Sequence, residues 1–218
     1  MMFFDPETFL ERDPATAVTP VEEKRLVREA EQRAGLCESM LRVVAKRGYA
    51  ETTIHEVVTA AGFGKLTYYK LFPSKEACFV AALEACAEVV FARIEAAVED
   101  EAESTARVAA GLGALVGLLA EEPELTRVTM VEARAGGVPS REVQLRLLDR
   151  LAGLIADGAE SDGEVSSTRL AIGAVSTIIA LEVAAERTAE LPGMLPELVD
   201  AALVSWLGTA RAVGLAER

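Results

Sequence analysis

The amino-acid sequence predicts an all-α protein with a helix-turn-helix domain at its N-terminus and a larger helical domain after it. Alanine is abundant, and aromatic residues make up only 5% of the 218 residues. Such a composition favours helix over sheet. Amphipathic helical periodicity recurs along the chain, and no β pattern of any length occurs. With 51% hydrophobic and 26% charged residues, the chain is long enough to bury a real core.

The first elements are an arm and a long helix. Residues 1–19 contain prolines and several acids without sustained periodicity, so we expect a flexible arm there. The next segment, 20–47, begins with a proline suited to a first helical turn and continues with a 3.6-residue apolar period. Gly35 could divide it into two helices. Gly48 ends it, as a C-cap glycine would.

Two short helices are predicted next. Thr53 and Glu56 form a capping box, in which the threonine hydroxyl accepts the N–H three residues on and the glutamate reaches back. Gly62 ends this helix after about two turns, and Gly64 can cap a second helix over 65–71. Two short helices joined by a tight glycine-containing turn are typical of a helix-turn-helix.

The remaining elements are amphipathic helices separated by polar, glycine or proline residues. Ser74 is a good N-cap for a long helix from Lys75 to about Val98. Further helices are expected near 102–120, 123–135, 140–158, 164–188 and 195–212. The last has apolar residues at helical spacing: Leu195, Leu198, Val199, Ala202, Leu203, Trp206 and Leu207. The helix around Leu170–Leu181 is apolar or small almost all round, so it must be covered on more than one side.

Charge is distributed unevenly along the chain. The net charge is −13, yet residues 24–75 carry +5, and every lysine lies between Lys24 and Lys75. An acidic protein with one basic segment is typical of a small nucleic-acid-binding module attached to another domain. The alternative is a basic face with no such role.

Several function classes are disfavoured by the residue inventory. His55 is the single histidine, and the three cysteines form no CxxC pair, so we expect no zinc site of the usual type and no cofactor. An enzyme would need a poised acid, base or nucleophile, and no such arrangement is evident. The uncharged runs of the C-terminal half are shorter than the roughly 20 residues that span a membrane. No signal peptide opens the chain, so a cytoplasmic location is expected.

Landmarks over residues 33–76 resemble the N-terminal domain of the tetracycline-repressor (TetR) family of bacterial transcriptional regulators. They are Gly48-Tyr49, Thr52-Thr53-Ile54, Ala60-Ala61-Gly62-Phe63, and Tyr69 followed by Phe72-Pro73-Ser74-Lys75-Glu76. Nearly all stand in the family's order and spacing, over about a fifth of the chain. The remaining length matches the family's ligand-binding and dimerisation domain in size only.

The resemblance implies a DNA-binding surface on the helix at 65–71. It implies that Tyr69 and Lys75 hold phosphates and that Lys65, Thr67 and Tyr68 face base edges. The full set of expected DNA contacts is Thr53, Lys65, Leu66, Thr67, Tyr68, Tyr69, Lys70 and Lys75. Two positions depart from the family. Gly64 replaces a serine or threonine cap, and Leu66 replaces a glycine, where it could contact a thymine methyl or obstruct docking.

The division implied for the chain is a DNA-binding domain over 20–74 and an effector-binding and dimerisation domain over 75–218. A homodimer is expected through the helices near 164–188 and 195–212, although these could instead close the monomer core. An effector pocket would be mostly apolar with a few polar groups. Its candidate lining residues are Phe91, Leu115, Leu119, Met130, Arg134 and Leu147.

The sequence therefore predicts a regulator that binds a palindromic double-stranded DNA operator as a dimer. We expect it in the bacterial cytoplasm, associated with the nucleoid, as a repressor released by a small-molecule effector; activation is the other possibility. The competing hypothesis is a helical ligand-binding dimer whose helix-turn-helix no longer binds DNA, suggested by Gly64 and Leu66.

Overall fold

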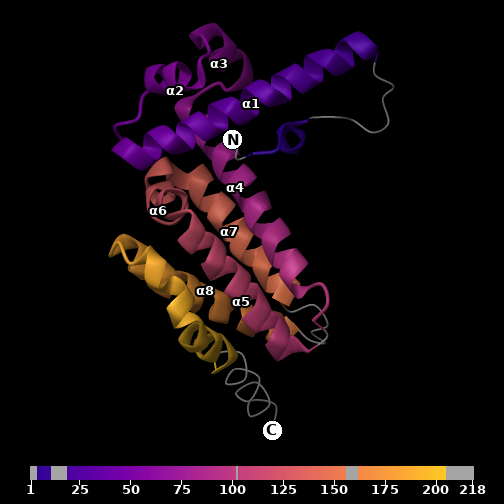
Figure 1. Ribbon diagram of the computed structural model, residues 1–218, viewed down its shortest axis with the longest axis vertical. Coiled ribbons are helices and arrows are strands. Elements are labelled where there is room, and N and C mark those ends of the chain that lie inside the picture. The colour runs from indigo at the N-terminus through magenta and orange to yellow at the C-terminus, as the bar shows by residue number, and fades with distance from the viewer. Residues whose placement is uncertain (1–3, 11–18, 102, 156–161, 205–218) are drawn as a thin grey trace. The chain divides into compact units, whose positions relative to one another are not determined.

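The computed structural model describes residues 4–10, 19–101, 103–155 and 162–204, and every element in those ranges is a helix (Figure 1). The all-α prediction is therefore confirmed. In chain order the elements are η1 (Pro6–Phe9), α1 (Pro20–Arg47), α2 (Ile54–Ala61), α3 (Lys65–Leu71), α4 (Lys75–Val98), α5 (Ser104–Glu121), α6 (Pro123–Met130), η2 (Glu132–Gly136), α7 (Gly137–Ile155), α8 (Asp162–Ala184) and η3 (Thr188–Met194), where η denotes a 3₁₀ helix. Residues 195–204 are also helical.

The chain folds into two compact units. The first contains the described residues up to Cys86 together with Glu132–Arg141, and the second contains Ala87–Val131 and the described residues from Glu142 onward. The first unit thus takes in the start of α4 and the whole of η2. The sequence grouped neither segment with the helix-turn-helix.

Helix α1 is one continuous helix of 28 residues rather than two. Thr19 and Glu22 form a capping box at its start, and Gly48, with φ +80°, ends it. Gly35 does not interrupt it. An added Cβ at Gly35 would lie 3.3 Å from the Phe63 ring, so the glycine lets α1 and the α2–α3 turn approach closely.

Residues 4–10 differ from the flexible arm expected over 1–19. Phe4 is buried, and its backbone N–H donates a 3.0 Å hydrogen bond to Glu38 Oε1 on α1. The Phe4 and Phe9 rings meet edge to face at 5.8 Å. Apolar burial therefore fixes η1 on α1, a contact that the prolines and acids of this stretch did not reveal. Residues 1–3 and 11–18 lie outside the described ranges.

The short helices α2 and α3 both pack on α1. Val44, Val58 and Phe72 are buried, and Ile54 and Phe63 are half-buried beside them. Gly62 ends α2 with a left-handed backbone (φ +71°), the conformation that favours glycine. Ser74 caps α4 by accepting the Ala77 N–H at 3.0 Å. Both turn signals of the sequence are therefore confirmed.

The second unit is built around two apolar clusters. One joins α5, α8, η3 and the helix at 195–204. The other joins α4, α5 and α7. Two expected helices end early: 123–135 becomes α6 followed by η2, and 164–188 ends at Ala184 before Glu186 adopts a positive φ. Of the helix expected near 195–212, residues 205–212 lie outside the described ranges, and Trp206 and Leu207 are among them.

Candidate nucleic-acid interface

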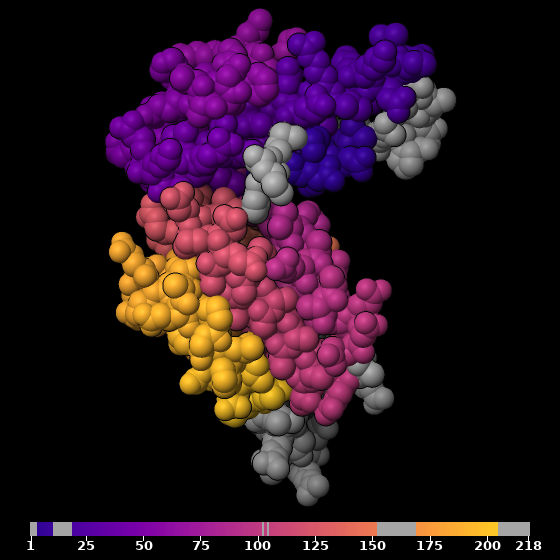
Figure 2. Space-filling view, viewed as in Figure 1, coloured from indigo at the N-terminus to yellow at the C-terminus, as the bar shows by residue number. Residues whose placement is uncertain are grey.

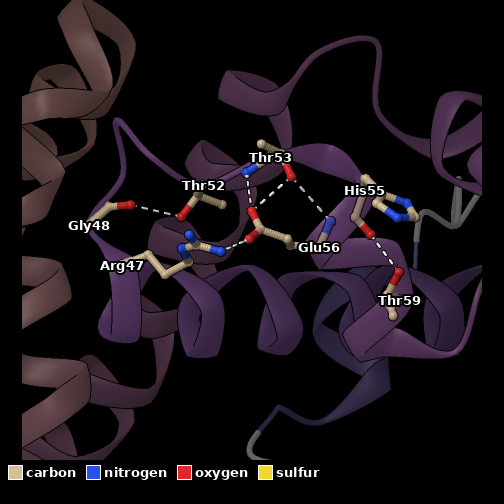
Figure 3. Close-up of polar contacts among 7 residues, drawn as sticks. All are labelled: Arg47, Gly48, Thr52, Thr53, His55, Glu56 and Thr59. Atoms are coloured by element: carbon tan, nitrogen blue, oxygen red, sulfur yellow. Dashed lines mark hydrogen bonds and ion pairs between the residues drawn. The ribbon is translucent and has the colours of Figure 1, made fainter.

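The start of α2 is fixed by the capping box that the sequence predicts. Thr53 Oγ1 accepts the Glu56 N–H at 3.3 Å, and Glu56 Oε2 accepts the Thr53 N–H at 3.0 Å (Figure 3). Arg47 at the end of α1 also pairs with Glu56. Hydrogen bonds from Thr53, and then Arg47, lower the pKa of Glu56. The Arg47–Glu56 pair therefore links α2 to α1. The capping box occupies the exposed Thr53 side chain that was expected to contact DNA.

Two more threonines make local bonds. Thr52 Oγ1 donates to the Gly48 carbonyl at 2.8 Å, and Thr59 Oγ1 donates to the His55 carbonyl at 2.7 Å (Figure 3). Thr52 is buried, whereas His55 is exposed on α2. The threonine pair at 52–53 therefore shapes the turn into α2.

Helix α3 has one exposed face and one buried face. Lys65, Leu66, Tyr69 and Lys70 are exposed, with Leu66 at 78% and Tyr69 at 56%. Leu71 is buried on the opposite side. In Figure 2 the α2 and α3 segment, in purple, forms an outer surface of the first unit. The structure thus presents four of the eight expected DNA contacts together, and Thr67 is half-buried beside them.

Tyr68 is a correction to the expected base contacts. Its side chain is 0% exposed, and its hydroxyl donates to the Ser74 carbonyl at 3.1 Å. Burial raises the pKa of this phenol. The physical reason is helical spacing, because Tyr68 and Leu71 stand three residues apart on the inward face of α3. That spacing was visible in the sequence and could have identified Tyr68 as a core residue.

Lys75 makes its hydrogen bonds within the protein, and the phosphate contact expected for its ammonium group stays a prediction. Lys75 Nζ donates to the carbonyls of Tyr49 at 2.9 Å, Thr52 at 3.0 Å and Ala50 at 3.4 Å. It also lies 4.3 Å from the centre of the Tyr49 ring. A lysine has three N–H donors, and three carbonyls take them. Lys75 therefore holds the loop between α1 and α2 through three hydrogen bonds.

Glu132 is a residue that the sequence analysis missed. This carboxylate comes from η2, 83 residues away, and accepts the Tyr49 N–H at 2.9 Å. The Tyr49 ring stacks on Phe79 with centroids 4.5 Å apart. The α1–α2 loop is thus held from α4 by Lys75 and from η2 by Glu132. No local sequence signal marks a contact between segments so far apart.

The three cysteines are packed in the first unit. Cys37, Cys78 and Cys86 are all buried free thiols. Cys37 Sγ lies 3.9 Å from the Cys78 carbonyl, and Cys78 Sγ lies 4.0 Å from the Leu36 carbonyl. Burial raises the pKa of the Cys86 thiol to about 12. The three buried thiols therefore behave as small apolar residues.

The expected effector-lining residues do not form one group. Phe91 and Leu147 belong to the cluster on α4, α5 and α7, whereas Leu119 and Met130 belong to the cluster around α5 and α8. Leu115 packs against both clusters. Arg134 is exposed on η2 in the first unit. Their apolar character therefore marks packing in the second unit and does not by itself define a ligand site.

The described ranges hold neither a group of metal-ligating side chains nor a helix suited to cross a membrane. Among those residues, no three histidine, cysteine, aspartate or glutamate side chains are grouped as metal ligands. Of the helices in the same ranges, none combines the length and apolar content that crossing a bilayer requires.

The part of the chain that matches a known protein family lies within the first unit. Residues 38–82 match the sequence model of bacterial regulatory proteins of the tetR family. The nucleoid occlusion factor SlmA of Haemophilus influenzae is 29% identical over 110 residues. That match spans about half of this chain and half the length of the curated relative.

Solved structures extend the likeness to most of the fold. The transcriptional regulator FadR of Bacillus subtilis, solved with stearoyl-CoA, has a TM-score of 0.65 at 18% identity, covering 78% of this chain and 97% of its own. A TetR-family transcription regulator of Marinobacter aquaeolei has a TM-score of 0.60 at 19% identity, covering 80% and 96%. Residues 38–82 of the chain therefore match the tetR-family model, and most of the chain shares the fold of these solved transcriptional regulators.

Proposed function

We propose that this protein is a sequence-specific regulator that binds a palindromic DNA operator as a homodimer and is released by a small-molecule effector. The exposed face of α3 carries the proposal, because it sets Lys65 and Lys70 beside Leu66 and Tyr69 within a tetR-family domain. Lysines attract phosphates, so we assign Lys65 and Lys70 to the backbone and the side chains between them to base edges when such a helix lies in the major groove. This assignment replaces the base contact of Lys65 and the phosphate contact of Tyr69 that the resemblance implies. The +5 charge of residues 24–75 supports the same surface.

A stripe on α8 supports the dimer. Leu170, Ala174, Thr177 and Leu181 are exposed at positions i, i+4, i+7 and i+11, which lie along one side of a helix. Leu170 and Leu181 are 66% and 63% exposed. The opposite side of α8 is buried in the second unit through Val175 and Ile179. A second copy covering this stripe would bury the two leucines, and the dimer would then carry two α3 helices, one for each operator half-site.

The effector is proposed to bind in the second unit and to be apolar or amphipathic. Both clusters of that unit are apolar, and the FadR relative was solved with stearoyl-CoA. For release, the effector must bind more tightly to a dimer whose α3 helices no longer match adjacent grooves. Repression by occupancy is the mode we propose, because a dimer bound across a promoter would block it.

Selection from a random duplex library with purified protein tests the function. An inverted repeat enriched at about physiological salt is the expected result, with affinity that falls steeply as salt rises. Lys70→Ala should weaken binding to the selected duplex. Arg93→Ala removes the same charge from an exposed position in the second unit and is the matched control. Equal effects of the two variants would contradict the α3 surface.

The second candidate is a ligand-binding helical dimer that no longer binds DNA. Leu66 favours it, since a bulky exposed side chain stands where the family usually has glycine. Under this hypothesis no duplex is enriched even at low salt, while the protein remains dimeric by sedimentation and binds a metabolite.

A further inference from the structure

Leu66 is an exposed apolar side chain on a face that also carries Lys65, Tyr69 and Lys70. At 78% exposure it equals Val21 as the most exposed large hydrophobic residue in the described ranges. Its neighbours on α3 are fixed, because Tyr68 and Leu71 anchor the other side of the helix in the core. The position of Leu66 on the surface is therefore set by a rigid element.

The order of side chains around α3 places Leu66 near the middle of the exposed face. With about 100° per residue, the four exposed residues fall within an arc of about 140°. Their order across that arc is Lys65, Tyr69, Leu66 and Lys70. Each edge of the face is a lysine and the centre is apolar or aromatic. On a duplex, the edges meet the phosphate walls of the major groove and the centre meets the bases.

The chemistry of base edges decides what Leu66 can recognise. In the major groove the bases present hydrogen-bond donors and acceptors, and thymine alone adds an apolar group, its C5 methyl. Leucine has no polar atom, so it would bury the polar edge of another base without a partner. Contact with a thymine methyl instead removes apolar surface of both groups from water.

We propose that Leu66 is a specificity-determining residue that contacts the C5 methyl of one thymine in each operator half-site. This inference rests on the proposed function and adds the identity of one base to it. Leu66 thus selects a base by its methyl group, while the flanking lysines hold the backbone.

The test replaces thymines of the selected operator one at a time with deoxyuridine, which removes the methyl group and keeps every hydrogen bond. For the unmodified protein, one position per half-site should lose about four-fold in affinity, the effect of leaving one methyl unburied. Leu66→Ala should bind the thymine and deoxyuridine duplexes equally. Val21→Ala, which trims an equally exposed residue of α1, should keep the full thymine preference.

Two outcomes would overturn this proposal while the regulator function stands: no deoxyuridine position affects the unmodified protein, or Leu66→Ala keeps the same sensitivity. If the unmodified protein binds no duplex, the proposed function fails, and the role of Leu66 fails with it. Circular dichroism of Leu66→Ala checks that its helices are intact, as expected for an exposed position.

Discussion

The two compact units differ in how their side chains act. In the first unit, hydrogen bonds from side chains fix the backbone. Glu56 accepts from Thr53 at the start of α2, and Lys75 donates to the Tyr49 carbonyl in the α1–α2 loop. In the second unit, two residues expected to line an effector pocket, Phe91 and Leu119, are instead packed in two separate apolar clusters. A motif built from caps and glycine turns therefore specifies its own local structure. A ligand site depends instead on how distant helices are arranged.

The two units differ less than this, because the first unit also buries or pairs residues that the motif predicts to be available for DNA. Tyr68 and Tyr69 are adjacent in sequence, yet one is buried and the other is 56% exposed. Lys70 is exposed, whereas Lys75 binds three carbonyls. The motif therefore identifies the helix that forms the DNA-binding surface. Burial and internal pairing then decide which side chains of the motif can reach DNA.

The largest effect is expected at Tyr68. Tyr68→Ala should lower the free energy of unfolding by about 3–5 kcal/mol, since it removes a fully buried ring and its bond to Ser74. Urea denaturation followed by circular dichroism measures this. Tyr69→Ala is the control and should change stability by at most about 0.5 kcal/mol while weakening DNA binding. A stable Tyr68→Ala protein that loses base specificity would restore the tyrosine to the DNA surface.

Leu119 tests the second unit. Leu119→Ala should cost about 2–5 kcal/mol, because the residue is buried in the cluster around α5 and α8. Leu145→Ala, at an exposed position of α7, should cost at most about 0.5 kcal/mol. The same urea experiment gives both values. Equal small costs would mean that Leu119 borders an open cavity, and the effector-lining prediction for this residue would gain support.

A substitution at Lys75 tests the three hydrogen bonds that hold the α1–α2 loop. Lys75→Met keeps the aliphatic stem but removes three hydrogen bonds, so we expect a loss of about 1–3 kcal/mol in stability. DNA affinity should fall as well, since the loop leads into α2 and α3. Lys70→Met should reduce DNA affinity with stability unchanged. A Lys75→Met protein of full stability and reduced salt dependence of DNA binding would instead assign Lys75 to phosphate.

The elements and turns of the first unit were predictable because their signals are local. Glu56 lies three residues from Thr53, and Gly62 and Gly48 end helices by their own backbone conformation. The Glu132 contact to Tyr49 was not predictable, since nothing within 83 residues of sequence links the two. The packing of Phe4 on α1 was not predicted for the same reason. Long-range packing decides such contacts, and a helical period does not encode it.

The smallest expected effect concerns the charge of Glu56. Its pKa is lowered in the folded protein by the Thr53 hydrogen bonds and then by Arg47, so the ionised carboxylate stabilises the fold above its ordinary titration range, near pH 4.3. Glutamine can still complete the capping box but carries no charge. Glu56→Gln should therefore melt at a slightly lower temperature than the unmodified protein at neutral pH.

As the pH falls below the ordinary carboxyl range and through the lower folded pKa, that difference in melting temperature should shrink to zero, because both proteins are then neutral at residue 56. Thermal melts between pH 7 and about pH 3 measure the trend. Glu51→Gln removes an exposed carboxylate from the same unit and controls for net charge. A difference that persists unchanged in acid would show that the box acts through shape alone, and the Arg47 pair would then contribute nothing to holding α2 on α1.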